Sequence, residues 1–171
     1  AFSGAFGHAY GHRQANAHGA KPDDWARATD TPGAHSMTHL AKFMADVEPR
    51  DFLARQPDPS LLDGDAGQAG RLRSDKIVAL RGAEGRMAAF YSAAGKPIRV
   101  RLDRLAEGRF WAFWFNPRNG QWHASGNETV RKTFFEAGVV TGPSAGIREF
   151  VCPSSGEGHD WVLALSAVEY L

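Results

Sequence analysis

One short stretch constrains the fold of this chain most: "RFWAFWFN", residues 109–116. In an extended strand, successive side chains point to opposite faces of the sheet. Both faces of this segment are apolar, with Phe110, Ala112 and Trp114 on one and Trp111, Phe113 and Phe115 on the other. Strands of antiparallel sheets commonly leave one face polar. The segment therefore predicts a second buried surface. The alternative is an exposed aromatic platform for sugar rings, which seldom needs both faces.

Other short apolar segments surround this one at a spacing of roughly ten residues, which is typical of an antiparallel sandwich. They are "KIVALR" (76–81), "RMAAFYS" (86–92), "PIRVRLD" (97–103), "QWHA" (121–124), "GIREFVC" (146–152) and "DWVLALS" (160–166). In "FNPRNGQW", Pro117 and Gly120 predict a hairpin turn in which the glycine has a positive φ. We therefore expect a mainly β fold, an antiparallel β-sandwich.

A single helix is predicted before the strands, in "TDTPGAHSMTHLAKFMADV" (29–47). Asp30 or Thr31 can cap it, and Pro32 suits its first turn. Its apolar stripe, at spacings of three and four, is Met37, Leu40, Phe43 or Met44, and Val47. The stripe is wide for a lone helix and needs a partner surface. The helix and one face of residues 109–116 either stay exposed or pack on each other.

The composition changes between residues 48 and 75, where Pro, Gly and Asp become frequent. We predict a domain boundary near residues 65–75 and three parts. Residues 1–50 hold a short strand, a loop and the helix, residues 51–75 form a connector, and residues 76–171 form the sandwich.

Overall composition excludes several classes of function. The 171 residues are 43% hydrophobic and 23% charged, as in ordinary soluble domains. Twenty Lys and Arg against nineteen Asp and Glu give no field that would recruit nucleic acid or an anionic membrane. No apolar run approaches the roughly 20 residues that span a bilayer. The lone Cys152 rules out an internal disulfide, and it is expected to be a small buried residue. Because the chain starts with Ala1, we expect that its original N-terminus was removed, and the lack of a signal peptide does not indicate the cytoplasm.

Candidate chemistry is concentrated at the start, in "GAFGHAYGH" (4–12). His8 and His12 there are equally consistent with a structural role and with contact to a substrate. His35 and His39 have the i, i+4 spacing of a metal pair, but no third ligand follows from spacing, so we interpret them as polar-face residues. The carboxylates, Asp58, Asp63, Asp75 and Asp160 among them, lie in loops or before a strand and not in apolar surroundings. We therefore predict no complete catalytic set, no metal site and no cofactor.

The chain resembles the C-terminal part of apiosidase-like bacterial glycoside hydrolases. The segments that carry this resemblance are "SGAFGHAYGH", "TPGAHSMTHLAKFM", "FLARQPDPSLL", "RMAAFYS", "FWAFWFNPRNG" and "GHDWVLAL", in that order. The resemblance implies the last strand and helix of a (β/α)₈ barrel in residues 1–50, followed by the β-sandwich called a "putative collagen-binding domain". It also implies that the catalytic carboxylates lie on earlier barrel strands. His8, Tyr10 and His12 would bind substrate at the mouth of the barrel.

The function expected from this resemblance is that of a C-terminal segment of a secreted or periplasmic glycoside hydrolase. That enzyme would act on plant-type side-chain sugars with a carboxylate pair, and this segment alone would be inactive. The sandwich would be an accessory domain packed on the barrel, and carbohydrate would be bound through the barrel. A second hypothesis is a stand-alone module that binds carbohydrate or collagen through exposed Trp111, Trp114 or Trp122. A third is a domain that only shields the barrel.

Overall fold

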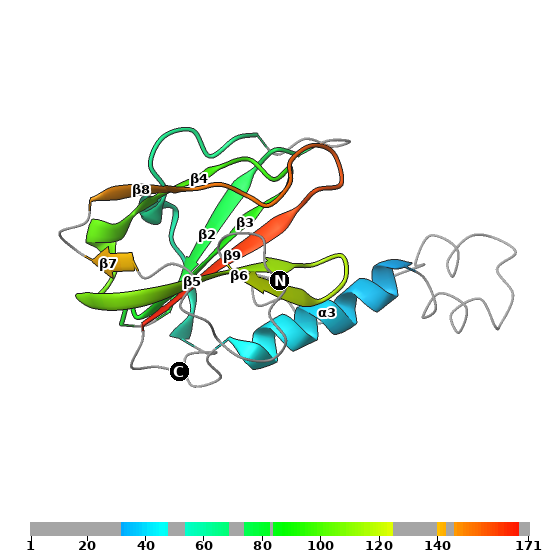
Figure 1. Cartoon of the computed structure of the whole chain (residues 1–171), viewed down its shortest axis with the longest axis horizontal. Coiled ribbons are helices and arrows are strands. Elements are labelled where there is room, and N and C mark those ends of the chain that lie inside the picture. The colour runs from blue at the N-terminus through cyan, green and yellow to red at the C-terminus, as the bar shows by residue number, and fades with distance from the viewer. Residues whose placement is uncertain are drawn as a thin grey trace, which may run out of the picture.

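The computed structural model describes residues 32–47, 54–68, 74–82, 84–124, 140–142 and 146–167. Within these ranges one α-helix, α3 (Pro32–Asp46), precedes the strands (Figure 1). The strands are β1 (Gln56–Pro57), β2 (Ile77–Arg81), β3 (Met87–Ser92), β4 (Ile98–Arg101), β5 (Gly108–Asn116), β6 (Gln121–Ala124), β7 (Val140–Gly142), β8 (Ile147–Phe150) and β9 (Trp161–Ala167). Two short 3₁₀ turns, η2 (Pro59–Leu61) and η3 (Leu102–Arg104), complete the described elements.

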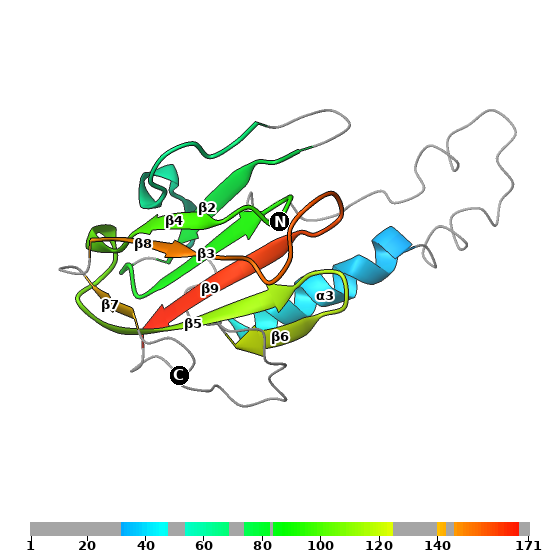
Figure 2. The same ribbon diagram turned by 45° about the horizontal axis from the view of Figure 1, so that its top comes forward.

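The larger sheet has seven strands. Its order is β1-β2-β3-β9-β5-β6, and β7 also pairs with β5. All its pairings are antiparallel. The last strand in the sequence, β9, lies in the middle of the sheet between β3 and β5 (Figure 2). There Leu163 pairs with Phe90 on one side and with Trp114 on the other, and all three side chains are buried.

The smaller sheet consists of β4 and β8 and covers one face of the larger sheet. Alternate residues of β2, β3, β5 and β9 point toward it, as the period of two along a strand requires. The resulting core includes Ala88, Phe90, Phe110, Trp114, Leu163 and Leu165 of the larger sheet and Ile98, Val100 and Phe150 of the smaller one. This is the predicted sandwich.

The opposite face of the larger sheet is also apolar, and α3 packs against it. Phe43 and Val47 of the helix join a second buried cluster. The sheet contributes Leu80, Met87, Ala89, Phe115, Val162 and Ala164 to this cluster. Of the two outcomes that the sequence left open for the helix and for residues 109–116, mutual packing is therefore the correct one.

The sequence predictions for the described residues are largely confirmed. The fold is mainly antiparallel β, each of the seven predicted strand segments contains a strand, and the helix lies within residues 29–47. Gly120 has a φ of 69°, as the predicted turn requires. Strands β1 and β7 were not predicted, because two or three residues are too few to show alternation. The strand and loop predicted before the helix lie outside the described residues. The division into 1–50, 51–75 and 76–171 stays a prediction.

Candidate functional site

The residues predicted to bind substrate, His8, Tyr10 and His12, lie outside the described residues, and their role stays a prediction. Among the residues that the structure does describe, no group of three or more His, Cys, Asp or Glu side chains is placed to hold a metal ion. His39 of α3 instead lies against the β5–β6 turn. A Cβ at Gly120 would come within 2.6 Å of its Nδ1 atom. The glycine is therefore needed both for its positive φ and for the close approach of the helix.

In the described part of the structure, the first candidate site is the junction between α3 and the sheet, where aromatic side chains meet. Phe43 is only 3% exposed, and its ring lies 5.2 Å from that of Phe115 and 5.6 Å from that of Trp122. Trp122 also contacts Phe115 edge-on at 5.0 Å. Three aromatic rings from the helix and from two adjacent strands thus form one cluster. Such aromatic pairs contribute about 0.5–1.5 kcal/mol beyond the burial of their area.

Polar contacts fix the C-terminal part of the helix at this junction. Trp122 Nε1 donates a 2.8 Å hydrogen bond to Asp46 Oδ2, and Lys42 forms an ion pair with the same carboxylate. Arg55, which follows the helix, donates to the carbonyl oxygen of Val47 and approaches Met44 Sδ at 3.5 Å. These contacts hold α3 to the sandwich at its last turn.

On the other flank of α3, an apolar pocket of about 250 Å³ opens between the helix and the sheet. Its lining is almost entirely hydrophobic and consists of Leu40, Phe43, Met44, Tyr91, Phe115, Pro117 and Val162. Leu40 and Met44 are half-exposed, so the pocket is a continuation of the buried junction toward the surface.

A polar network lies at the end of the sheet next to this pocket. Tyr91 donates its hydroxyl proton to Asp160 Oδ2 at 3.2 Å, and Arg118 Nη1 lies 3.8 Å from Asp160 Oδ1. The guanidinium of Arg118 stacks over the ring of Trp161 at 4.9 Å and donates to Asn116 Oδ1 at 3.0 Å. Burial, followed by the charge and the hydrogen bond of Asp160, raises the pKa of Tyr91 to about 12. This phenol stays protonated at neutral pH and ties β3 to the residue before β9, and Arg118 ties the β5–β6 turn to the same carboxylate.

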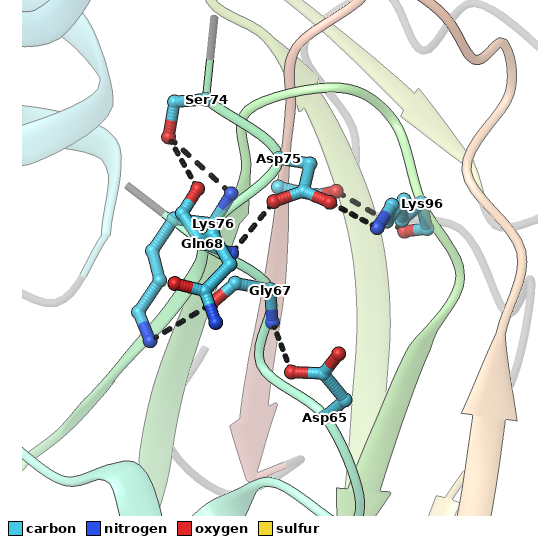
Figure 3. Close-up of polar contacts among 8 residues, drawn as sticks. Asp65, Gly67, Gln68, Ser74, Asp75, Lys76 and Lys96 are labelled. Carbon is cyan, nitrogen blue, oxygen red and sulfur yellow. Dashed lines mark hydrogen bonds and ion pairs between the residues drawn. The ribbon is translucent and has the colours of Figure 1, made fainter. Parts of the chain in front are cut away.

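A second polar cluster joins residues 65–68 to residues 74–76, which precede β2 (Figure 3). The Asp75 carboxylate accepts a 2.6 Å hydrogen bond from the backbone N–H of Gln68 and forms an ion pair with Lys96. Asp65 accepts the N–H of Gly67 at 2.8 Å, and Lys76 Nζ donates to the carbonyl of Gly67 at 3.3 Å. The hydrogen bond from Lys96, and then that from Gln68, lowers the pKa of Asp75. A general acid needs the opposite shift, so the lowered pKa does not favour Asp75 for that role.

The other carboxylates that the sequence placed in loops have structural partners too. Asp58 pairs with Arg81 at 3.0 Å, and Asp63 accepts a 2.7 Å bond from Arg99. The buried Cys152 donates to the carbonyl of Lys96 at 3.1 Å, which agrees with the predicted structural role of this cysteine. In the described part of the chain, these side chains thus have partners within the fold.

The proposed aromatic platform is corrected in part. Trp114 is 2% exposed and lies in the sandwich core, so it is not a surface residue. Trp122 is half-buried and engaged with Phe43 and Asp46. Trp111 is half-buried, with its ring 6.3 Å from that of Phe113. The Arg118 network was missed by sequence reasoning, although the turn "NPRNG" and the Asp160 that precedes β9 were both noticed separately.

Comparison with known proteins gives three findings. Residues 56–166 match the family model described as "Putative collagen-binding domain of a collagenase". A glycoside hydrolase family 5 structure from Bacteroides vulgatus ATCC 8482 superposes with a TM-score of 0.64 and 22% identity, over 86% of this chain and 27% of that one. A second structure, described as a glycoside hydrolase, superposes with a TM-score of 0.69 and 25% identity, over 99% of this chain and 35% of that one.

The chain thus spans only about a third or less of the length of these two solved chains. No curated protein matches it. Among the described residues, there is no helix with the length and apolar character needed to cross a membrane.

Proposed function

Because the chain belongs to the family of "putative collagen-binding domains" of collagenases, and because its solved neighbours are glycoside hydrolases, we propose that it is an accessory domain of a glycoside hydrolase. The finer proposal is that this enzyme is secreted or periplasmic, is apiosidase-like, and removes side-chain sugars from plant-type polysaccharides. In it, residues 1–50 would be the last strand and helix of a (β/α)₈ barrel, with His8, Tyr10 and His12 in contact with substrate.

The observation that carries this proposal is the packing of α3 on the outer face of β5. Phe43 contacts Phe115 and Trp122, so the aromatic face that could have formed a sugar platform holds a helix instead. That helix precedes the family's domain in the sequence, and its Phe43 and Val47 are buried in one cluster with the sheet. A helix that belongs to an upstream domain and packs on the sandwich would fix the sandwich relative to that domain.

The direct test is an activity assay of the 171-residue chain on aryl glycosides and on plant polysaccharides that carry side-chain sugars. We expect no turnover, because the carboxylate pair would lie on earlier barrel strands. Measurable hydrolysis that is lost when one carboxylate of this chain, for example Asp160, is changed to Asn would overturn the proposal. The coding sequence upstream of Ala1 provides the second test, since it should encode about 200 or more residues with βα periodicity.

A second function, binding of a glycan or of collagen, is favoured by the family's description and by the half-exposed Trp111 on the outer face of β5. Calorimetry of the chain with oligosaccharides and with collagen peptides tests it. Binding that is lost in Trp111→Ala, but retained in a variant of the exposed Arg104, would support a binding module. No heat with either ligand class would leave the accessory role alone.

A further inference from the structure

The turn between β5 and β6 contains the dipeptide Asn119–Gly120, whose chemistry the proposed function does not use. Among the asparagines of the sequence, Asn119 alone precedes a glycine. A main-chain nitrogen can attack the side-chain amide of the residue before it, and glycine hinders this attack least because it has no Cβ. Asn119 is exposed, whereas Gly120 is buried. The dipeptide is therefore a candidate for spontaneous deamidation, and the contacts around it decide when the reaction can occur.

Hydrogen bonds within the turn engage both reacting groups. The N–H of Gly120, the attacking group, donates to the carbonyl oxygen of Asn116 at 2.9 Å. The Oδ1 atom of Asn119 accepts the N–H of Gln121 at 3.0 Å, and its Nδ2 atom donates to Gln121 Oε1 at 3.4 Å. Ring closure therefore requires that Gly120 leaves its acceptor and that the amide of Asn119 turns from Gln121 toward the Gly120 nitrogen.

Helix α3 runs alongside the same turn in both views of the molecule (Figures 1 and 2). A Cβ at Gly120 would come within 2.6 Å of His39 Nδ1, so the imidazole lies directly against the glycine. One turn further along the helix, Phe43 stacks on Trp122 of β6 and holds the helix in this place. The movement of Gly120 that the reaction needs is thus opposed by the docked helix as well as by the bonds of the turn.

We propose that Asn119–Gly120 is a deamidation site that the docking of α3 keeps closed. In the reaction, hydroxide removes the Gly120 N–H proton and the nitrogen attacks Asn119 Cγ. The N–Cγ bond forms, the Cγ–Nδ2 bond breaks and ammonia leaves, which produces a five-membered succinimide. Water then opens this ring at either carbonyl carbon and gives aspartate or isoaspartate. Because water and hydroxide are the only other reactants, the rate is governed by how often the turn opens.

The two products have different consequences for the docking of α3. Aspartate leaves the main chain unchanged and still offers an oxygen to the N–H of Gln121. Isoaspartate routes the main chain through Cβ and places one more carbon between residues 119 and 120. Gly120 then no longer fits between the carbonyl of Asn116 and the ring of His39. Conversion to isoaspartate is therefore a slow, one-way release of the turn from the helix.

Ageing of the chain at mildly alkaline pH tests the proposal. The native chain and the chain unfolded in guanidinium chloride are incubated side by side, and deamidation is followed by mass spectrometry of peptides. Fragment ions distinguish Asn119 from Asn127, which follows it in the sequence. His39→Ala removes the ring that lies against the turn. Ala41→Gln is the matched control, because Ala41 is an exposed residue of the same helix. Circular dichroism verifies that each variant is folded.

We expect Asn119 to deamidate at least about tenfold more slowly in the native chain than in the unfolded one, because local opening must precede the reaction. His39→Ala should raise the native rate, and Ala41→Gln should leave it unchanged. Equal rates in the native and unfolded chains would overturn the proposal, and so would a lack of conversion at Asn119 in the unfolded chain. If His39→Ala ages no faster than the native chain, the bonds of the turn alone protect the site, and the role of α3 is wrong.

Hydrogen exchange of the native chain is a second measurement, and it needs no variant. The Gly120 amide should open with the same free energy as the Val47 amide of α3, which donates to the carbonyl oxygen of Phe43 at 3.0 Å. Much faster exchange at Gly120 than at Val47 would mean that the turn opens while the helix stays docked, which contradicts the proposal.

The isoaspartate form, separated from the aspartate form by chromatography, tests the predicted release. Asn119→Asp reproduces the aspartate product and should unfold at a denaturant concentration close to that of the native chain. The isoaspartate form should unfold at a lower concentration than Asn119→Asp. Equal midpoints would show that the longer main chain does not disturb the turn, and the predicted release would be wrong.

Discussion

Trp122 Nε1 donates a 2.8 Å hydrogen bond to Asp46 Oδ2 and thereby joins β6 to the last turn of α3, across 76 positions of sequence. The indole also stacks on Phe43, with its ring centroid 5.6 Å from the phenyl ring. One side chain therefore contributes both a polar and an apolar contact to the docking of the helix. The two contributions can be separated by mutation.

Trp122→Phe should keep most of the ring contact and lose the hydrogen bond, so we expect a loss of about 1 kcal/mol in the free energy of unfolding. Asp46→Ala should cost a similar amount, whereas Asp46→Asn keeps an acceptor and should cost less. Urea unfolding followed by circular dichroism measures these changes. The double variant Trp122→Phe/Asp46→Ala should be less destabilised than the sum of the two single variants. Strict additivity would show that the bond does not form in solution.

Lys42→Ala is the control for the charge of Asp46, since Lys42 pairs with the same carboxylate on the exposed side of the helix. Ion pairs of this i, i+4 kind contribute about 0.3–0.5 kcal/mol. A loss in Lys42→Ala as large as that in Trp122→Phe would mean that the ion pair, and not the indole, holds the end of the helix.

Gly120 gives a second test of the helix position. Its φ of 69° disfavours any side chain, and a Cβ there would also meet His39 Nδ1 at 2.6 Å. Gly120→Ala should therefore cost more than backbone strain alone, which is about 1–3 kcal/mol for a non-glycine residue in this region. Gly158→Ala is the matched control, because its φ is 74° and nothing lies within 4 Å of the new Cβ.

The difference in unfolding free energy between these two glycine variants measures the contact with His39. Adding His39→Ala to Gly120→Ala should recover part of that difference by making room for the methyl group. If the two glycine variants are equally destabilised and His39→Ala recovers nothing, α3 does not lie against the β5–β6 turn.

The sequence predicts that the helix and the strand each need an apolar partner surface, but it does not predict that they pack on each other. The strand "RFWAFWFN" is apolar on both faces. The apolar stripe of the helix, which ends at Val47, is too wide to remain exposed to solvent. Both patterns demand a partner surface because their periods, 2 and 3.6, fix which side chains share a face. Neither pattern states which partner is used. The contact of Phe43 with Phe115 depends on the approach of elements that are distant in sequence, and only the structure supplies it.

The polar networks could not be predicted from the sequence, for a similar reason. Asp160 was interpreted as a residue before a strand, and Arg118 as part of a turn, and both interpretations are locally correct. Their proximity arises because β9 inserts between β3 and β5, which brings Tyr91, Arg118 and Asp160 to one end of the sheet. Strand order of this kind has no signature in local composition.

The ionisation of Tyr91 is the third prediction. Burial and the neighbouring Asp160 raise its pKa from 10.0 to about 12. Between these values an unfolded chain loses the phenolic proton and the folded chain keeps it, so stability contributed by Tyr91 falls as the pH rises above 10. The difference in phenolate absorbance between the native protein and Tyr91→Phe isolates this group. We expect its midpoint near 12 and a lower midpoint in Asp160→Asn. A midpoint near 10 in the folded native protein would place Tyr91 in solvent, away from Asp160.

Cys152 should be almost inert in the folded protein. Burial raises the pKa of its thiol to about 12, against an ordinary 9.0, although a hydrogen bond with Ser92 opposes the shift. The thiolate is the reactive form, so disulfide reagents at pH 8 should modify the native protein at least about a hundredfold more slowly than the urea-unfolded chain. Because the folded pKa is the higher one, stability falls as the pH rises from 9 toward 12, and Cys152→Ser, which does not ionise there, should reduce that slope. Rapid modification of the native chain at pH 8 would mean that the seam between β8 and the larger sheet opens readily.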